Sequence, residues 1–412
     1  LNQFSLDEHR GFLRVLTTHG ENWDTGEASE TVLTVLEEQG DRLVAVGEVR
    51  GLGQGEQLYS ARLLGDVGFA VTFRQIDPFY VLDLSPQNSL ANWLVGKGFQ
   101  VFMVSWRNPD PEHRDWSLAS YIDAIEKAHA ATMEITGSPD INFKALCAGG
   151  LTTSIALARY AAQKRLHTVK SLTLNVTLLD VGGLEQTNLG HFLTPGMLEE
   201  RRAQTKKDGV LHGHQMAKMF AWIRPNDLVW NYWVNNYLMG QKPAAFDVLF
   251  WNSDATRMPA ALLSDFLDLA IDNPFGRGQC WALPDAEIDL KKVTVDQFVV
   301  AGRSDHITPW NACYNSVNIL GGKSEFVLVN SGHIQTLVCP PGKGKATYQT
   351  ASITPEDPQD WLAASKAITG SWWEHWSPWL AERSGDKRPA PKALGSARYT
   401  GLGSAPGTYV RQ

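Results

Sequence analysis

Apolar and polar positions change their period several times along the chain. Apolar runs predict strands, and segments of helical period between them predict helices. The predicted strands are Phe79–Leu84, Phe99–Ser105, Ile141–Leu146, Val169–Leu179, Val295–Ala301 and Glu325–Val329. The predicted helices are Ser89–Lys97, Ser117–Ile135, Leu151–Ala162 and a segment from Pro309 to Leu320. This alternation indicates an α/β fold with a mostly parallel sheet and helices on both of its faces.

The same pattern divides the chain into four parts. Residues 1–64 are polar and irregular, with weak strand patterning at Leu43–Val46, and we expect a peripheral N-terminal segment. Residues 65–180 are expected to form the first part of the core. Residues 181–292 lose the alternation and hold amphipathic, Trp-rich segments, which predict a helical cap inserted into the core. Residues 293–412 then complete the core and end in a C-terminal tail.

Cys147 lies where a predicted strand runs into a predicted helix. A residue at such a junction occupies a sharp turn, and in α/β-hydrolases this turn is the nucleophile elbow. Its usual form is G-x-nucleophile-x-G, whereas here Ala145 takes the place of the first glycine and Gly149 that of the second. We predict that Cys147 is the nucleophile and that the Ala148 N–H stabilises an oxyanion. The alternative is that Cys147 is a small buried hydrophobic residue.

A carboxylate and an imidazole each follow a later predicted strand. Asp305 comes shortly after the strand that ends at Ala301, and His333 comes after the strand that ends at Val329. The order nucleophile, acid, histidine is that of α/β-hydrolases and differs from the chymotrypsin and subtilisin orders. Asp305 could instead cap the helix near Pro309, and His333 could be a structural loop histidine. Taken with Cys147, they predict a Cys-His-Asp triad.

Composition excludes several classes of protein. The 412 residues are 43% hydrophobic and 20% charged, which is typical of a globular protein, and the net charge of −7 without a long basic run gives no support for nucleic-acid binding. The four cysteines have neither paired nor metal-type spacing, and no apolar segment of membrane-spanning length is present. We therefore expect a reduced, cytoplasmic protein without a metal or a transmembrane segment. The 15 Trp indicate either a larger core or apolar surface for an acyl pocket, a dimer face or a hydrophobic product.

Several long motifs resemble those of polyhydroxyalkanoate synthases. Their residues are most similar to the class that polymerises medium-chain monomers. The resemblance covers the chain from about residue 65 to the C-terminus. The motifs are Val104–Pro109, Trp222–Leu238, Trp251–Pro259, Asp305–Tyr314, Leu320–Gln335, Cys339–Gly342 and the tail Ala405–Val410.

The resemblance implies a fold, a reaction and partners. It implies an α/β-hydrolase fold whose cap covers Cys147, and a reaction in which medium-chain (R)-3-hydroxyacyl-CoA acylates Cys147 and a polyester chain grows. The CoA thioester is then a substrate, and no cofactor is expected. It further implies a homodimer that acts in the cytoplasm at the surface of polyester granules.

One loop departs from the family pattern. Such synthases usually read Pro-Pro-x-Ile-Asn-Lys-x-Tyr, whereas here Asp77 stands where Asn is expected and Pro78 where Lys is expected. Ile76 and Asp77 fall where hydrolases build a second oxyanion donor. An ionised carboxylate close to that position would repel the developing charge.

The residue types at the predicted site favour acyl transfer between thiols. A thiolate attacks thioesters well and is itself a good leaving group, so Cys147 suits acyl exchange between thiols, with His333 removing the thiol proton. Together with what the resemblance implies, this predicts a polyester synthase. Asp305 either orients His333 or helps to deprotonate the substrate hydroxyl. A cysteine-dependent thioesterase or polyester hydrolase is the alternative if the cap admits water. A non-catalytic granule-associated homologue is the alternative if the Asp77 loop removes the oxyanion hole, and a general esterase is disfavoured.

Overall fold

The structure is a computed structural model that describes residues 6–19, 30–52, 57–64, 67–73, 88–182, 194–213, 215–216, 230, 233–241, 256–342, 346–391 and 393–403. The chain divides into two compact units. The first unit holds Leu1–Ile76 and Trp230–Ala244. The second unit holds Asp77–Val229 and Ala245–Gln412, and it contains the three predicted triad residues.

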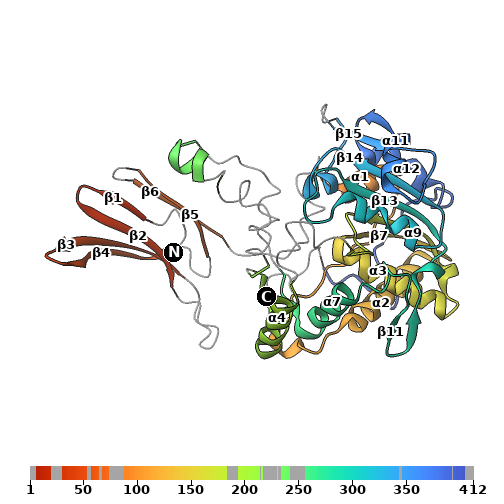
Figure 1. Cartoon of the computed structure of the whole chain (residues 1–412), viewed down its shortest axis with the longest axis horizontal. Helices are drawn as coiled ribbons and strands as arrows, with labels where there is room; N and C mark the ends of the chain where they lie inside the picture. Colours follow the sequence, from red (N-terminus) through yellow and green to blue (C-terminus); the bar gives the residue numbers. More distant parts are fainter. Residues whose placement is uncertain are drawn as a thin grey trace. The chain divides into compact units, whose positions relative to one another are not determined.

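The first unit is built from antiparallel strands (Figure 1). Strands β1 (Leu6–His9), β2 (Phe12–His19), β3 (Glu30–Gln39) and β4 (Arg42–Leu52) form a four-stranded sheet in chain order. Strands β5 (Gln57–Leu64) and β6 (Val67–Phe73) pair as a separate hairpin. A π-helical turn, Trp233–Leu238, also belongs to this unit.

Residues 1–64 therefore contain regular strands where the pattern indicated mostly irregular structure. Arg10 and Gly11, with φ of 55° and 82°, join β1 to β2, and two positive φ angles in a two-residue loop are the geometry of a tight hairpin turn. Gly40, with φ of 70°, begins the turn from β3 to β4. Register shifts between β3 and β4 interrupt the alternation of apolar residues, which hides the strand period in the sequence.

The main sheet of the second unit has six described strands. They are β7 (Ile141–Leu146), β8 (Val169–Asn175), β13 (Asp296–Gly302), β14 (Ser324–Val329), β15 (Thr347–Thr350) and β16 (Lys366–Thr369). Their order across the sheet is β16-β15-β14-β13-β8-β7. Strands β7, β8, β13 and β14 are parallel, whereas β15 and β16 pair antiparallel. The predicted mostly parallel sheet is confirmed.

Helices follow the strands as the alternation predicted. Their bounds are α1 Leu90–Gly96, α2 Leu118–Thr136, α3 Cys147–Ala162, α4 Pro195–Asp208, α7 Ala260–Asp272, α8 Trp310–Tyr314, α9 Ser316–Ile319, α10 His333–Leu337, α11 Pro358–Ala364 and α12 Trp372–Ala381. Ser89 caps α1, and Gly137, with φ of 64°, ends α2. None of the described helices is long and apolar enough to cross a membrane.

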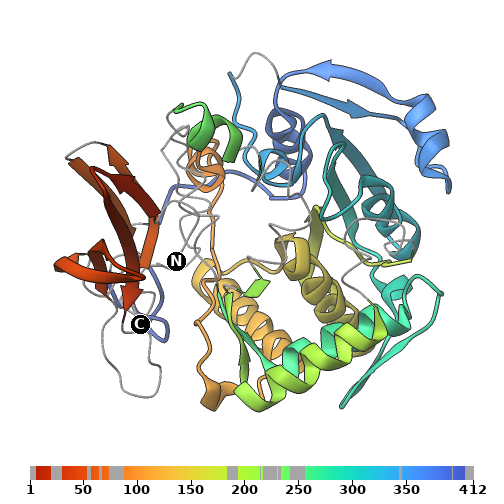
Figure 2. The same cartoon turned by 60° about the vertical axis from the view of Figure 1, so that its left-hand side comes forward.

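Each face of the main sheet is buried by its own set of helices (Figure 2). Helices α2, α3, α8 and α9, with Trp361 of α11, pack on one face. Helices α1 and α12 pack on the other, where Trp372, Trp373 and Trp376 are fully buried. A large part of the tryptophan surplus in the C-terminal half therefore belongs to the core.

The segment between β8 and β13 contains a helical pair and short strands. Helices α4 and α7 pack through Leu198, Leu263 and Leu267, and Arg202 pairs with Asp268 at 2.6 Å. The short strands are β9 (Val210–Leu211), β10 (Met258–Pro259), β11 (Trp281–Leu283) and β12 (Ala286–Ile288). The cap over residues 181–292 stays a prediction, because much of it lies outside the described residues.

Three predicted elements differ from the structure. Residues 99–105 form no strand, because no ladder joins them to another described segment. The strand predicted to reach Leu179 ends at Asn175, where Val176 adopts a φ of 45°. The helix predicted after Pro309 is broken at Asn315 into α8 and α9, and the Asn315 amide donates to Asp180 at 2.9 Å. The predicted strand 79–84 lies outside the described residues.

Candidate active site

Cys147 occupies a strained turn between β7 and α3. Its φ is 48°, in the left-handed region that residues with a side chain rarely adopt. The thiol-bearing residue is partly exposed, whereas Ala145, at the first glycine position of the elbow motif, is buried in the core. This is the backbone geometry of a nucleophile elbow, in which the side chain is held clear of the chain on either side.

A close approach behind the elbow explains one of the two glycines that follow Cys147. A Cβ added to Gly150 would lie 2.0 Å from the Thr177 hydroxyl oxygen, so no other residue fits at position 150 without rearrangement. A Cβ added to Gly149 would meet no atom within 4 Å. The glycine that the packing requires is therefore Gly150, one position beyond the second glycine of the sequence motif.

Asp305 follows β13 and is enclosed by hydrogen-bond donors. Its Oδ1 accepts the backbone N–H groups of Ile307 and Thr308, each at 2.9 Å. Its Oδ2 accepts the Thr308 hydroxyl at 2.7 Å and approaches His333 Nδ1, also at 2.7 Å. The side chain has 0% exposure. Burial opposes the charged form, but the bond with His333 and the other donors together hold the pKa of Asp305 below its ordinary value.

His333 begins α10, directly after β14, and lies between Asp305 and Cys147. Burial by itself would lower the pKa of His333, but the hydrogen bond to Asp305 and the contact with the Cys147 thiol raise it to about 9. Because Nδ1 faces Asp305, Nε2 is the nitrogen left for the thiol. The three predicted residues thus come from the carboxyl ends of three parallel strands, and the structure brings them together.

The loops that carry Asp305 and His333 are packed tightly against each other. A Cβ added to Gly302 would lie 2.5 Å from the Thr336 hydroxyl oxygen and 2.7 Å from the Ser331 carbonyl oxygen. The Thr336 hydroxyl in turn lies 2.9 Å from the Ser331 hydroxyl and donates to the Gly332 carbonyl at 2.8 Å. These close contacts between backbone and hydroxyl groups fix the two loops against each other.

The predicted oxyanion donors fall into two groups. Ala148 is the second residue of α3 and is exposed, and amides in the first turn of a helix have no acceptor within that helix. Its N–H is therefore available to a ligand beside Cys147. Ile76 and Asp77 lie outside the described residues, so the second oxyanion loop stays a prediction.

Thr308 is a site residue that the sequence reading missed. It is buried, donates its hydroxyl to Asp305, and lies 3.2 Å from His333 Nδ1. The spacing Asp-x-x-Thr was a usable signal, because an Asp side chain commonly accepts N–H groups two and three residues later. The alternative in which Asp305 caps the helix near Pro309 is wrong, because the N-cap residue of α8 is Pro309 and the backbone N–H groups that the Asp305 carboxylate accepts belong to the loop before that helix.

No metal is needed to explain the acidic and histidine groups found near one another. Among the described residues, Asp110, Glu112 and His113 could place one ligand atom each within 4.8 Å of the others. However, Asp110 pairs with Arg257 at 3.1 Å, and His113 Nδ1 accepts the Asp110 backbone N–H. These contacts account for two of the three groups structurally.

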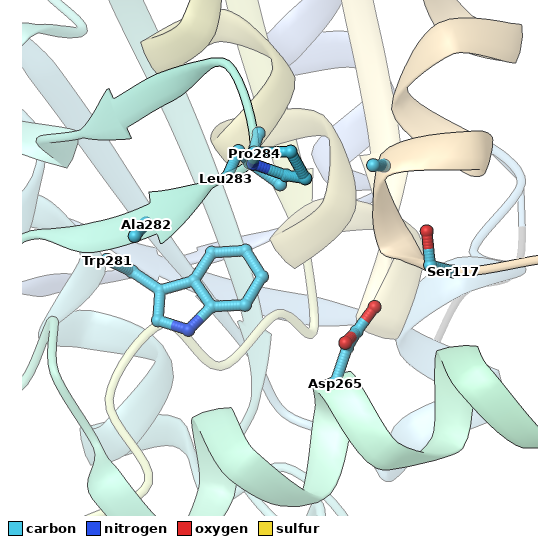
Figure 3. Close-up of a pocket in the computed structure, with 7 residues that line it drawn as sticks. Ser117, Asp265, Trp281, Ala282, Leu283 and Pro284 are labelled. Atoms are coloured by element: carbon cyan, nitrogen blue, oxygen red, sulfur yellow. The ribbon is translucent and has the colours of Figure 1, made fainter.

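A cavity of about 380 Å³ lies between α2, α7 and β11 (Figure 3). Its lining is mostly apolar, with Ser117 and Asp265 as the polar residues, and the described residues that line it are Ser117, Ala119, Asp265, Trp281, Ala282, Leu283 and Pro284. Asp265 accepts the Leu118 N–H at 2.7 Å, and burial raises its pKa. Of the predicted site residues that the structure describes, none lines this cavity.

Two families match different parts of the chain. The α/β hydrolase fold family matches residues 80–338, which include Cys147, Asp305 and His333. A β-propeller domain family matches residues 1–91, which include β1–β6. A propeller blade is a four-stranded antiparallel sheet, and β1–β4 have that order. The residue pattern of positions 1–64 did not predict this likeness.

Curated relatives agree with the hydrolase match. Poly(3-hydroxyalkanoate) polymerase 2 of Ectopseudomonas oleovorans is 47% identical over 336 residues, which are 82% of this chain and 60% of that protein. The poly(3-hydroxyalkanoate) polymerase subunit PhaC of Cupriavidus necator is 37% identical over 406 residues, which are 95% of this chain and 68% of that protein. The chain belongs to the poly(3-hydroxyalkanoate) polymerase family.

The relatives differ in how much of their length this chain matches. The chain spans 60% of the length of each of the two Ectopseudomonas oleovorans polymerases. A further relative, an uncharacterized protein of Archaeoglobus fulgidus, is 54% identical over 105 residues, which are 25% of this chain and 15% of that protein. The predicted family and α/β-hydrolase fold are confirmed, and the residue roles follow as proposals.

Proposed function

We propose that this chain is the catalytic part of a polyester synthase that polymerises (R)-3-hydroxyacyl groups from CoA thioesters and releases CoA. The observation that carries the proposal is Cys147 on a left-handed turn beside His333, which is bonded to the buried Asp305. Membership of the polymerase family supplies the substrate class. No cofactor is required, because the thiol, the imidazole and the thioester complete the chemistry.

The first half-reaction transfers the acyl group to the enzyme. His333 takes the proton of the Cys147 thiol, and the thiolate attacks the carbonyl carbon of the acyl-CoA thioester. Negative charge gathers on the carbonyl oxygen, where the Ala148 N–H donates. The carbon–sulfur bond to CoA then breaks, CoA leaves with the proton from His333, and the hydroxyacyl group remains on Cys147.

The second half-reaction forms the ester. The 3-hydroxyl of one unit attacks the thioester carbonyl of the next unit while His333 accepts the hydroxyl proton. The Cys147 thiolate is expelled and regains a proton from His333, and the chain is longer by one unit. A water molecule in place of the hydroxyl would give a free hydroxy acid, so a cap over Cys147 favours polymer over hydrolysis.

In this proposal Asp305 orients His333. Its side chain is fully enclosed, and its two oxygens already accept from Ile307, Thr308 and His333. A substrate hydroxyl could reach such a carboxylate only by displacing one of these donors. The enclosure therefore favours an orienting role over direct deprotonation of the substrate.

The resemblance and the relatives further support a set of finer expectations. We expect a preference for medium-chain monomers, assembly as a homodimer and action in the cytoplasm at the surface of polyester granules. The nearest alternative reaction is that of a cysteine-dependent thioesterase, which shares every step up to the acyl-enzyme. The non-catalytic alternative requires that Cys147 is never acylated.

One assay tests the proposal and separates the alternatives. Purified chain is given short-chain and medium-chain (R)-3-hydroxyacyl-CoA, free thiol is followed with time, and the product is analysed as polymer or free acid. CoA release with insoluble polyester is expected. CoA release with only free hydroxy acid would make the protein a thioesterase, and no release from either substrate would favour the non-catalytic homologue.

A further inference from the structure

Polar residues line one face of the two strands nearest the elbow. In the β7–β8 register, Asn142 lies opposite Ser171 and Lys144 opposite Thr173, and Asn175 ends the same row. The Ser171 hydroxyl donates to Asn142 Oδ1 at 2.6 Å. This is the face on which α12 packs with its buried tryptophans. A row of polar groups under the buried apolar face of a helix is costly unless the groups are satisfied there.

Lys144 is the one cation in this row. Its ammonium donates to Asn175 Oδ1 and lies 5.2 Å from the ring centre of Trp372 and 5.1 Å from that of Trp376. Two indole faces and one amide oxygen are suitable partners for a buried ammonium. Burial nevertheless lowers the pKa of Lys144 to about 7. No ion pair of the described residues includes Lys144.

The charged groups on the neighbouring helix have other partners. Helix α12 and the turn after it present four such groups. His375 bonds Glu325 at 2.5 Å, Arg383 pairs with Asp296 at 2.8 Å and with Glu382 at 3.4 Å, and Glu374 is exposed. The residues of β8 that face Lys144 are Thr173 and Asn175, which carry no charge. The charge of Lys144 is therefore balanced by dipoles and aromatic rings.

The hydrogen bond from Lys144 to Asn175 lies next to the turn that carries the nucleophile. Asn175 lies opposite Leu146 in the register, and Leu146 is the residue directly before Cys147. Asn175 is fully buried, and its amide nitrogen has no acceptor among the described residues, so its oxygen bond to Lys144 is what holds the side chain. Lys144 therefore bonds the side chain of the residue that is paired with the last strand position before Cys147.

The contact of Lys144 with the Trp372 ring connects it to the helix that begins at His333. The Trp372 indole N–H donates to the Thr336 carbonyl at 2.8 Å, and Thr336 lies in α10, three residues after His333. Trp372 is fully buried, so its ring position is set by packing and by the cation against it. Lys144 thus touches one residue beside the elbow and one residue bonded to the histidine helix.

We propose that Lys144 is a positioning residue, which through Asn175 and Trp372 sets the separation between the Cys147 thiol and His333. The ammonium form holds both partners, and the neutral amine loses its attraction to the indole rings. Displacement of reacting groups by a fraction of a bond length is enough to change reactivity. The inference rests on the proposed role of Cys147 as nucleophile.

The test is the alkylation of Cys147 by iodoacetamide in the intact purified chain between pH 5.5 and 9, with the modified peptides measured by mass spectrometry after digestion. It needs no acyl-CoA, so it is independent of whether polymer forms. Cys280 is exposed and serves as an internal reference in the same sample. The variants are Lys144→Met and Asn175→Asp, with Lys170→Met, an exposed lysine on β8, as the matched control.

We expect three results. Lys144→Met slows Cys147 alkylation at neutral pH by about tenfold and removes an inflection near pH 7, while Cys280 is unchanged. Asn175→Asp places a carboxylate against the ammonium and moves the inflection upward by about one pH unit or more. Lys170→Met keeps the wild-type profile.

Two outcomes overturn the inference. One is a natively folded Lys144→Met protein, judged by near-ultraviolet circular dichroism, whose Cys147 reacts with the wild-type rate and pH profile. The other, decisive if Lys144→Met does not fold, is an Asn175→Asp protein whose inflection does not move. A normal alkylation response in a protein without CoA release would instead reject the proposed function and leave the positioning role intact.

Discussion

The two halves of the candidate site are built in opposite ways. Cys147 is partly exposed on a left-handed turn, with its reactive atom presented to the outside. Asp305 and His333 are enclosed, and every oxygen of the carboxylate is bonded. A nucleophile must reach and release substrates, whereas an acid–base pair must keep one geometry through both half-reactions. The exposure of Cys147 meets the first demand, and the complete hydrogen bonding of Asp305 meets the second.

The largest effect on CoA release is expected when the nucleophile Cys147 is replaced. Cys147→Ala removes the atom that carries the acyl group, and we expect CoA release to fall by about 10⁴-fold or more. Thiol release from (R)-3-hydroxyacyl-CoA measures it. Cys280→Ala, which changes an exposed cysteine elsewhere, should keep nearly full activity. Turnover retained in Cys147→Ala would show that Cys147 is not the nucleophile.

Breaking the hydrogen bonds of Asp305 should lower the rate of CoA release nearly as much. Asp305→Asn replaces an acceptor of four hydrogen bonds by an amide that can accept only on one side, and it releases His333 Nδ1. We expect kcat for CoA release to fall by on the order of 10³- to 10⁴-fold. The control is Asp296→Asn, at the opposite end of β13, which breaks the pair with Arg383. Equal losses in both variants would mean that the effect is on folding.

The pKa of His333 predicts a pH-dependent contribution to stability. The folded value of about 9 lies above the ordinary 6.5, so the stabilisation is fully present below about pH 6.5 and is lost as pH rises through about 9. Lys144 acts in the opposite direction, because its folded value of about 7 lies below the ordinary 10.5. The destabilisation that it causes is fully present below about pH 7 and fades as pH rises toward 10.5.

Because these trends oppose each other, the measurement is a difference between variants. Urea unfolding is compared for wild type and His333→Gln near pH 6 and near pH 10. The variant should lose on the order of 2 kcal/mol more relative to wild type at the lower pH. His167→Gln, an exposed histidine, should show no such difference. A His333→Gln penalty that is the same at both pH values would contradict the raised pKa.

A smaller effect on kcat is expected when one hydrogen-bond donor to Asp305 is removed. Thr308→Val takes a hydroxyl from Asp305 Oδ2 but leaves the Thr308 backbone N–H in place. We expect a loss of about tenfold in kcat with little change in KM, since one charge-assisted hydrogen bond is involved. Thr369→Val, on the edge strand β16, is the control. If kcat is unchanged, the enclosure of Asp305 does not depend on this hydroxyl.

The smallest effect concerns the loop that departs from the family pattern. If Ile76 and Asp77 supply the second oxyanion donor, Asp77→Asn removes a repelling charge and should raise kcat by about threefold. Pro78→Lys alone serves as the comparison, because it changes the neighbouring departure without touching the carboxylate. An unchanged rate in Asp77→Asn would place that side chain away from the oxyanion.

The sequence alone determined the main fold and the chemistry of the candidate site. Apolar runs alternating with helical periods are local signals, so β7, α2, β13 and β14 could be located without tertiary information. The order of Cys147, Asp305 and His333, each after a strand, predicted their convergence because parallel strands end at one edge of the sheet. Long family motifs then supplied the substrate class.

Other features were decided only by tertiary structure. The strands of residues 1–64 depend on pairing and on turns such as Arg10-Gly11, which composition does not reveal. The requirement for Gly150 arises from Thr177 on another strand end, and the role of Thr308 arises from the folded loop around Asp305. Lys144 breaks an apolar strand in sequence, and only the packing of α12 shows that two indole rings accommodate it. Local period can place an element, but close approach between distant residues exists only after the chain has folded.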